Sequence, residues 1–198
     1  MKPKLYNTQR CPYARRTRIV LHEKEIDFDT YEVDLANKSE EFLRASPTGK
    51  VPVVVVDGDS IYESNVVNQY LDEVTDRPKL TPEDPKQRAY ARIWMAFADT
   101  DFFPAVFVAS AGRERGFSED RISEAREKLG TALGKLEERL EGRDYLADEF
   151  SLADVAHAGN FVRVRELEER GELSLEEYPN VAAWMRRLEA RESYEAAV

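Results

Sequence analysis

Residues 51–64 decide the fold, and they read Val51-Pro52-Val53-Val54-Val55-Val56-Asp57-Gly58-Asp59-Ser60-Ile61-Tyr62-Glu63-Ser64. The β-branched run over 51–56 is typical of a strand that is buried on both faces of a sheet. Asp57-Gly58 is a hairpin signal that predicts pairing with a second strand at 60–62. Ser64 then stands where a side chain caps the N-terminus of a helix. This stretch therefore predicts two antiparallel strands that lead into a helix.

The residues before this stretch predict the rest of a mixed sheet. Residues 4–6 predict the end of a short strand, and residues 12–24 predict a helix. Polar and apolar residues alternate over 27–33, as they do in a half-buried strand. A short helix is expected near 39–45. The element order over residues 1–76 is therefore βαβαββα.

The chain changes character after this first domain. Prolines with few apolar side chains mark residues 77–86 as a linker. Beyond the linker, apolar residues recur at helical spacing, and the predicted helices cover 86–110, 119–141, 152–165 and 180–190. Residues 87–198 are therefore expected to form an all-helical domain. In that domain Ser151 and Asp154 fit a capping box, which is a folding element and not a catalytic acid.

The composition disfavours several classes of protein. The formal net charge of −10 disfavours nucleic acid as a direct partner, because phosphate binding needs clustered cations. A single cysteine cannot form an internal disulfide, and no apolar run approaches a signal peptide or a membrane span. We therefore expect a cytoplasmic protein without a membrane partner. His22 and His157 lack metal-ligand spacing, so no metal is expected.

That cysteine, Cys11, lies at the junction of the first strand and the first helix. Pro12 suits the first helical position. A helix that begins there directs its unpaired N–H groups and its positive dipole end at the sulfur, which favours the thiolate. Ala14 occupies the position at which a two-cysteine redox motif carries its second thiol. Disulfide chemistry at Cys11 would therefore need an external thiol.

Three segments resemble the soluble glutathione transferase superfamily. They are Cys11-Pro12-Tyr13-Ala14 followed by Arg16-Thr17-Arg18, Val51-Pro52, and Glu63-Ser64. The likeness is closest to the cysteine-type branch, called omega class, whose first motif also reads Cys-Pro-aromatic-Ala. The resemblance extends over the whole chain and implies a thioredoxin-like N-terminal domain, a C-terminal bundle of α-helices and a homodimer.

The resemblance also implies a site for glutathione, as co-substrate, beside Cys11. Val51 would precede a cis-proline, Pro52, and pair through its main chain with the cysteinyl part of glutathione. Glu63 and Ser64 would hold the γ-glutamyl group. Lys38 would reach the glycine carboxylate. Tyr13 would flank the sulfur or pack beneath the first helix.

The residues by themselves allow plainer interpretations of the same positions. Pro52 could simply be a proline at the start of a strand. Helix capping alone explains Ser64, and an exposed lysine such as Lys38 is ordinarily solvated. Charges such as Arg15, Arg16 and Arg18 usually form surface ion pairs, although an arginine near Cys11 could also help to hold a thiolate.

Three functions follow from this sequence. In the first, Cys11 takes a glutathionyl group as a mixed disulfide and a second glutathione releases it, so the protein is a glutathione-dependent thiol transferase or reductase. In the second, the fold serves a non-catalytic regulator that binds RNA polymerase, like stringent starvation protein A. In the third, the protein conjugates glutathione to hydrophobic electrophiles in a pocket between the domains. That pocket would be lined by Trp94, Phe97, Phe102, Phe103 and Phe107, although such a stripe more often belongs to the core.

Overall fold

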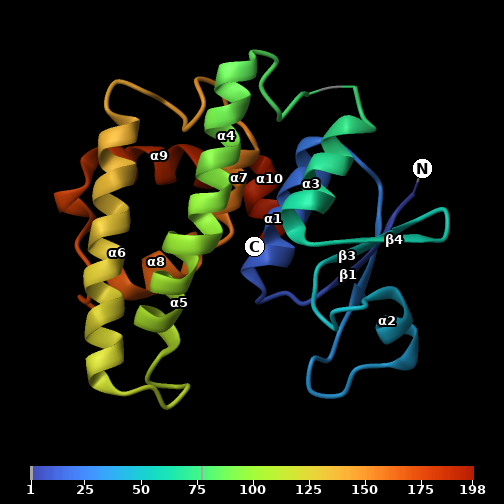
Figure 1. Ribbon diagram of the computed structural model, residues 1–198, viewed down its shortest axis with the longest axis horizontal. Helices are drawn as coiled ribbons and strands as arrows, with labels where there is room; N and C mark the ends of the chain where they lie inside the picture. Colours follow the sequence, from blue (N-terminus) through green and yellow to red (C-terminus); the bar gives the residue numbers. More distant parts are fainter. Residues whose placement is uncertain (1, 77) are drawn as a thin grey trace. The chain divides into compact units, whose positions relative to one another are not determined.

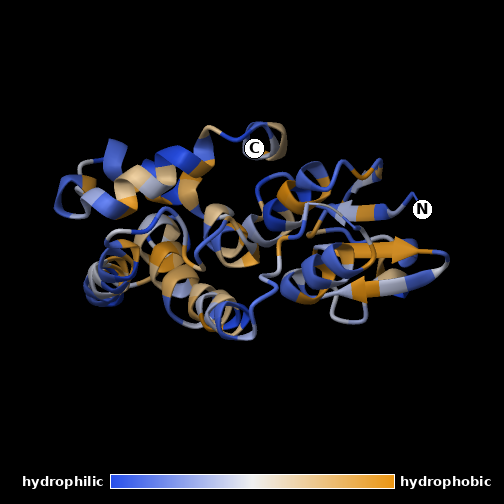
Figure 2. Ribbon diagram, turned by 90° about the horizontal axis from the view of Figure 1, so that it is seen from above, coloured by the Kyte–Doolittle hydropathy of each residue, from blue (hydrophilic) through white to orange (hydrophobic). Residues whose placement is uncertain are grey.

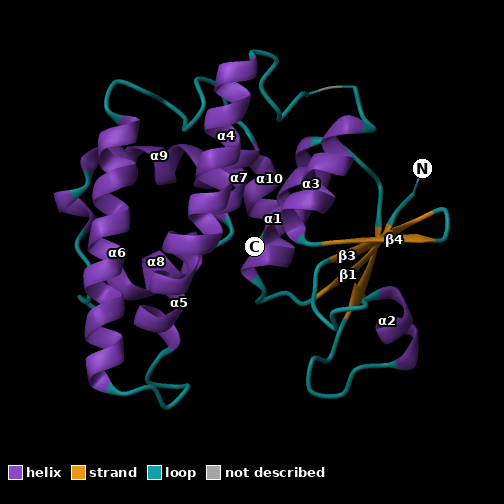
Figure 3. Ribbon diagram, in the orientation of Figure 1, coloured by secondary structure: helices purple, strands orange, loops and turns teal. Residues whose placement is uncertain are grey.

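The computed structural model describes residues 2–76 and 78–198 (Figure 1). These residues form two compact units. The first contains the described residues up to Thr81 together with Arg191–Val198, and the second is Pro82–Ala190. The four-stranded sheet belongs to the first unit, whereas helices occur in both (Figure 3).

The first unit has the predicted βαβαββα order, so the thioredoxin-like fold is confirmed. Its elements are β1 (Lys4–Asn7), α1 (Pro12–Glu23), β2 (Asp29–Glu32), α2 (Glu40–Ala45), β3 (Val53–Val56), β4 (Asp59–Tyr62) and α3 (Ser64–Glu73). The strand order in the sheet is β2-β1-β3-β4. β1 is parallel to β2 and antiparallel to β3, and β3 is antiparallel to β4.

The valine run forms the central strand β3. Val53 and Val54 are fully buried and Val56 nearly so, because a central strand is covered on both faces. Asp57 and Gly58 adopt positive φ angles of 51° and 96°, which is the geometry of a tight hairpin. The strand arrows in Figure 2 are accordingly largely orange, the colour of hydrophobic residues.

The second unit is helical, as predicted. It contains α4 (Pro85–Phe97), the π-helical turn η1 (Ala98–Phe102), α5 (Phe103–Ala111), α6 (Glu119–Leu140), α7 (Leu152–Ala158), α8 (Phe161–Glu169), the 3₁₀ turn η2 (Leu175–Glu177) and α9 (Pro179–Glu189). The single helix predicted over 152–165 was wrong, because the chain breaks at Gly159 and Asn160 between α7 and α8.

The expectation that no segment approaches the length of a membrane span was also wrong. α4, η1 and α5 run on as one helix of 27 residues, Pro85–Ala111, which is long and apolar enough to cross a membrane by length and composition alone. Core helices of soluble proteins pass the same test. Here Ala98, Phe102 and Val106 are almost fully buried within the protein, so this helix contributes to the core.

The C-terminal segment and the predicted linker both differ from the sequence-based boundaries. Helix α10 (Glu192–Ala197) was expected in the helical domain but belongs to the first unit, where it packs on α1. The first unit also extends to Thr81 because the buried Asp72 carboxylate accepts hydrogen bonds from the main-chain N–H groups of Leu80 and Thr81, at 2.8 and 2.9 Å. Met1 and Arg77, which fall in the predicted domain and linker, lie outside the described residues.

Candidate functional site

Cys11 stands at the N-terminus of α1, as predicted. It is the N-cap residue, and its carbonyl accepts the first helical hydrogen bond from the N–H of Arg15 at 2.9 Å. Its side chain makes no capping bond, so the sulfur is not used to satisfy the helix. Half-buried, Cys11 packs against a core cluster that contains Tyr6, Val33 and Phe42.

The thiol meets the segment that was predicted to bind a peptide-like ligand. The Val51–Pro52 peptide bond is cis, which confirms the prediction and excludes a plain strand-start proline. Cys11 Sγ lies 3.9 Å from the Val51 carbonyl oxygen and donates its S–H to it. The residue before the cis-proline therefore presents its main chain to the sulfur.

The sheet register explains why these distant segments converge. Val53 pairs with Tyr6 of β1 and with Tyr62 of β4. One residue beyond these pairs, towards the same end of the sheet, lie Asn7, Pro52 and Glu63. The loop that leads to Cys11, the cis-proline and the start of α3 therefore share one end of the sheet.

Glu63 and Ser64 differ in detail from the sequence prediction. Ser64 was expected to cap α3, but the N-cap is Glu63 and Ser64 is the first helical residue. The physical reason is that the Glu63 carbonyl accepts the helix's first bond, from Val67 N–H at 2.9 Å. Glu63 has φ 67° and ψ 111°, a conformation that costs free energy in a residue with a Cβ and that is concentrated at functional sites. Ser64 is buried while Glu63 is exposed.

Lys38 is exposed and lies beside the turn before β3. A Cβ built on Gly49 would come within 3.3 Å of Lys38 Nζ, and Gly49 itself has φ 62°. Tyr13 is half-buried, and the guanidinium of Arg16 lies 4.8 Å from its ring centroid.

The arginines of α1 are not the surface groups that their charge predicted. Arg15, Arg16 and Arg18 are all buried. Arg18 donates hydrogen bonds to the main chain of the loop before Cys11 and to the C-terminal helix. Burial, and next the charge of Arg15, lower the pKa of Arg18 to about 10, which leaves it charged at neutral pH. Sequence reasoning missed these contacts, although Arg18 follows Cys11 by seven residues, which is about two helical turns.

Two features of the second unit are structural. Asp154 completes the predicted capping box with Ser151, and it also accepts hydrogen bonds from Leu146 N–H and Trp184 Nε1. Burial raises the pKa of Asp154 to about 6, against the effect of those hydrogen bonds. His157 is fully buried among aromatic rings that include Phe102 and Trp184, so the core interpretation of that aromatic stripe holds for Phe102.

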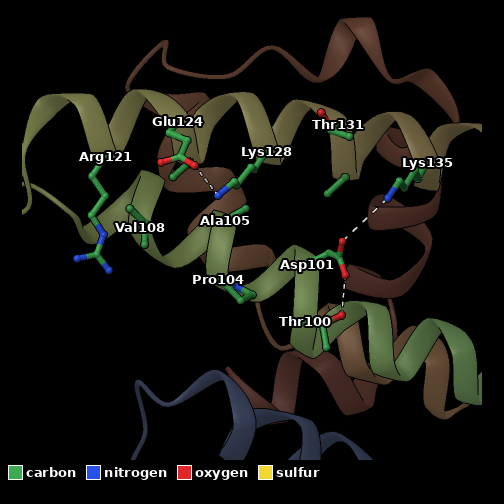
Figure 4. Close-up of a pocket in the computed structure, with 12 residues that line it drawn as sticks. Thr100, Asp101, Pro104, Ala105, Val108, Arg121, Glu124, Lys128, Thr131 and Lys135 are labelled. Carbon is green, nitrogen blue, oxygen red and sulfur yellow. Dashed lines mark hydrogen bonds and ion pairs between the residues drawn. The ribbon is translucent and has the colours of Figure 1, made fainter.

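A groove of about 470 Å³ lies between η1–α5 and α6 in the second unit (Figure 4). Four of its charged groups form two pairs: Lys128 lies 2.7 Å from Glu124, and Lys135 lies 4.0 Å from Asp101. No residue of the predicted glutathione site lines it. We therefore assign it no part in the thiol chemistry. Among residues 2–76 and 78–198, no group of His, Cys, Asp or Glu side chains is arranged to hold a metal.

Comparison with known proteins identifies the family. The family model described as "Glutathione S-transferase, N-terminal domain" matches residues 10–74, and that described as "Glutathione S-transferase, C-terminal domain" matches residues 98–192. Glutathione S-transferase U28 of Arabidopsis thaliana is 34% identical over 191 residues, covering 94% of this chain and 84% of its own. The chain belongs to the glutathione S-transferase family.

Solved structures agree on the family and differ in class. Glutathione transferase Omega 3C from Trametes versicolor has a TM-score of 0.88 at 27% identity, with 100% of this chain and 89% of that one covered. A Tau-class enzyme from mango, Mangifera indica, has a TM-score of 0.86 at 27% identity, with 99% and 92% covered. A glutathione S-transferase from Methylobacillus flagellatus, with glutathione bound, has a TM-score of 0.83 at 32% identity, with 100% and 99% covered.

Proposed function

We propose that this glutathione S-transferase acts as a glutathione-dependent thiol transferase, with Cys11 as its nucleophile. The observation that carries the proposal is the thiol at the Val51 carbonyl, beside the cis Val51–Pro52 bond. A ligand whose cysteinyl group pairs with the Val51 main chain would bring its sulfur to Cys11. The sulfur of that ligand would then lie beside the Cys11 thiol, where other members of the family would present a serine or tyrosine hydroxyl.

The reaction is a pair of thiol–disulfide exchanges. The Cys11 thiolate attacks the glutathionyl sulfur of a mixed disulfide between glutathione and a second thiol. A bond forms between the two sulfurs, the original disulfide breaks, and the second thiol leaves as a thiolate that takes up a proton. A second glutathione thiolate then attacks the glutathionyl sulfur on Cys11, which releases oxidised glutathione and restores the Cys11 thiolate. Ala14 offers no resolving thiol, so glutathione itself resolves the intermediate.

The other predicted site residues would hold the glutathionyl group. Glu63 is exposed and would pair with the α-ammonium of the γ-glutamyl group. Ser64, at the start of α3, would donate to the α-carboxylate, where the helix N-terminus also favours an anion. Lys38 would bind the glycine carboxylate. Tyr13, in the first turn of α1, would flank the Cys11 sulfur.

Conjugation is a second candidate, favoured by the plant relative and by the Tau-class structure. In that reaction the glutathione thiolate itself attacks an electrophilic carbon, and Cys11 forms no covalent bond. The polymerase-binding regulator has no comparable support: the chain shares its family with transferases and carries its cysteine at the Val51 carbonyl. Retention on immobilised glutathione, with no co-purifying polymerase, is the expected result.

Mass spectrometry after treatment with oxidised glutathione separates the two reactions. Because Cys11 is the single cysteine, one glutathionyl adduct is expected on the wild type and none on Cys11→Ser. Reduced glutathione should remove the adduct. An unmodified wild type, or an equal adduct on Cys11→Ser, would refute the mechanism. Turnover of a small disulfide and of an aromatic electrophile, measured side by side, then ranks exchange against conjugation.

We further propose a homodimer in the cytoplasm. The support is the family's usual assembly and the single unpaired cysteine, which suits a reducing compartment. Light scattering at several protein concentrations tests the dimer: a mass of one chain at all of them would contradict it.

A further inference from the structure

We propose that Arg18 and the C-terminal helix α10 form a strap that fixes the loop before Cys11, which makes Arg18 a positioning residue for the thiol. The proposal deepens the proposed function, since it rests on Cys11 as the nucleophile. Every group that carries it belongs to the first unit.

The loop between β1 and α1 is held through its main chain. Arg18 Nη2 donates to the Gln9 carbonyl at 2.9 Å, and Nη1 donates to the Thr8 carbonyl at 3.5 Å and to the side-chain oxygen of Asn7. The Thr8 carbonyl also accepts from the N–H of Cys11 at 3.0 Å. Arg18 is therefore one hydrogen bond away from the main chain of the reactive residue.

The same guanidinium binds the C-terminal helix. Arg18 Nε and Nη2 both donate to the Ala197 carbonyl, at 3.0 and 2.8 Å. The loop reaches the same segment directly, because Gln9 Nε2 donates to the Val198 carbonyl at 2.8 Å. One planar fork thus joins the loop, α1 and the end of α10.

The other end of α10 is attached to α1 as well. Arg191 donates through Nε and Nη2 to the two oxygens of Glu23, at 2.6 and 2.8 Å, and Ser193 Oγ donates to Glu23 at 2.5 Å. Glu23 is the last residue of α1. Helix α10 therefore spans α1 from its C-terminal end back to the loop that precedes Cys11.

The geometry requires an arginine. Arg18 is 5% exposed, and its donors are shared among acceptors on three segments. A lysine keeps the charge, but it places three donors on one atom and cannot reproduce the fork. Loss of the fork would free the loop, and Cys11 Sγ would then leave its position 3.9 Å from the Val51 carbonyl. Small displacements of this kind cost large factors in rate.

The test uses full-length variants and two readouts. Arg18→Lys removes the fork, and Ala197→Pro disrupts the last turn of α10, where Ala197 is fully buried. Each should slow glutathionylation of Cys11 by oxidised glutathione by about tenfold. Each should also speed hydrogen exchange at the Cys11 amide. Because the two substitutions break the same connection, between Arg18 and the end of α10, the double variant should react no more slowly than either single variant.

Thr17→Val is the matched control. Thr17 precedes Arg18 in α1 and donates to buried Asn68 at 2.9 Å, so the variant loses a buried hydrogen bond without touching the loop. It should lower the Tm and leave the rate at Cys11 unchanged. If Thr17→Val loses as much Tm as Arg18→Lys and is glutathionylated as slowly, the slowing is a general effect of stability and the proposal is overturned.

The two proposals fail separately. If the wild type forms no glutathionyl adduct, the proposed function fails, and the strap is then judged by alkylation of Cys11 with iodoacetamide and by amide exchange. A wild-type alkylation rate and wild-type exchange in both Arg18→Lys and Ala197→Pro would refute the strap. Multiplying effects in the double variant would also refute it.

Discussion

Replacing Lys24 with methionine should destabilise the first unit strongly. Lys24 Nζ lies 2.7 Å from Asp72 Oδ1, and the two side chains are 0% and 2% exposed. Removing one partner of a buried pair leaves the other charge without compensation, at a cost of about 3–5 kcal/mol. Of its hydrogen bonds from described residues, Asp72 would keep those from the N–H groups of Leu80 and Thr81. Because folded domains are stable by about 5–15 kcal/mol, the loss is a large share of the total.

The variant should also release the segment that follows α3. Lys24 Nζ donates to the carbonyls of Thr75 and Pro78 as well as to Asp72, so it ties this segment to α1. Urea unfolding followed by far-UV circular dichroism measures the free energy, and hydrogen exchange at the amides of residues 79–81 measures the release. Both tryptophans, Trp94 and Trp184, lie in the second unit, so their fluorescence reports on that unit separately.

Lys2→Met is the matched control. Lys2 Nζ also lies 2.7 Å from a carboxylate, that of Asp29, but the two side chains are 50% and 48% exposed. An exposed pair contributes little because water screens it, so this variant should leave the unfolding free energy almost unchanged. Equal losses for Lys24→Met and Lys2→Met would refute the argument that burial, and not distance, sets the cost.

The pH dependence gives a second check. Burial raises the pKa of Asp72, but hydrogen bonds from Lys24, Leu80 and Thr81 outweigh it, and the pKa lies below its ordinary value of 3.8. A carboxyl of this kind stabilises the folded state above its unfolded pKa, and the stabilisation disappears as the pH falls through the folded value. Acidification below about pH 4 should therefore remove this contribution in the wild type. Lys24→Met should show a weaker or reversed slope there.

Three further predictions concern single positions. Glu63→Gly should raise the free energy of unfolding by up to about 1 kcal/mol, because glycine adopts φ 67° without strain. Isothermal titration should show that the same variant binds glutathione more weakly, and an unchanged affinity would contradict the role of Glu63. Gly49→Ala should cost about 1 kcal/mol or more in urea unfolding, since φ is 62° and the new Cβ would crowd Lys38; a stabilised variant would contradict this. Asp154→Ala should lower the free energy of unfolding by about 2 kcal/mol or more, since buried donors of Leu146 and Trp184 lose their acceptor. The folded fraction should still form the adduct at Cys11, and a lost adduct at wild-type stability would count against this prediction.

The sequence by itself determined most of the elements and the place of the single cysteine among them. The valine run, the Asp57-Gly58 turn and the helical spacing beyond the linker are local patterns, because the periods of strands and helices are fixed by backbone geometry. Pro12 identified the start of α1 because its fixed φ and missing N–H suit the first helical position, and Cys11 could therefore be placed at a helix N-terminus. The cis Val51–Pro52 bond was predicted from the family resemblance and not from the local pattern.

Only the tertiary structure decided where the side chains meet. A charged residue in a helix carries no local signal of burial, so Arg18 was expected at the surface, whereas it is 5% exposed and joins three segments. The N-cap position falls on Glu63 and not on Ser64, because the Glu63 carbonyl accepts the first helical hydrogen bond of α3; the Glu63 side chain itself makes no capping bond. Helix α10 belongs to the first unit because both of its ends bond to α1: the Ala197 carbonyl accepts from Arg18, and Arg191 donates to Glu23. The burial of Arg18 and the placement of α10 depend on groups far apart in the chain, whose pairing in a dry interior outweighs local preference.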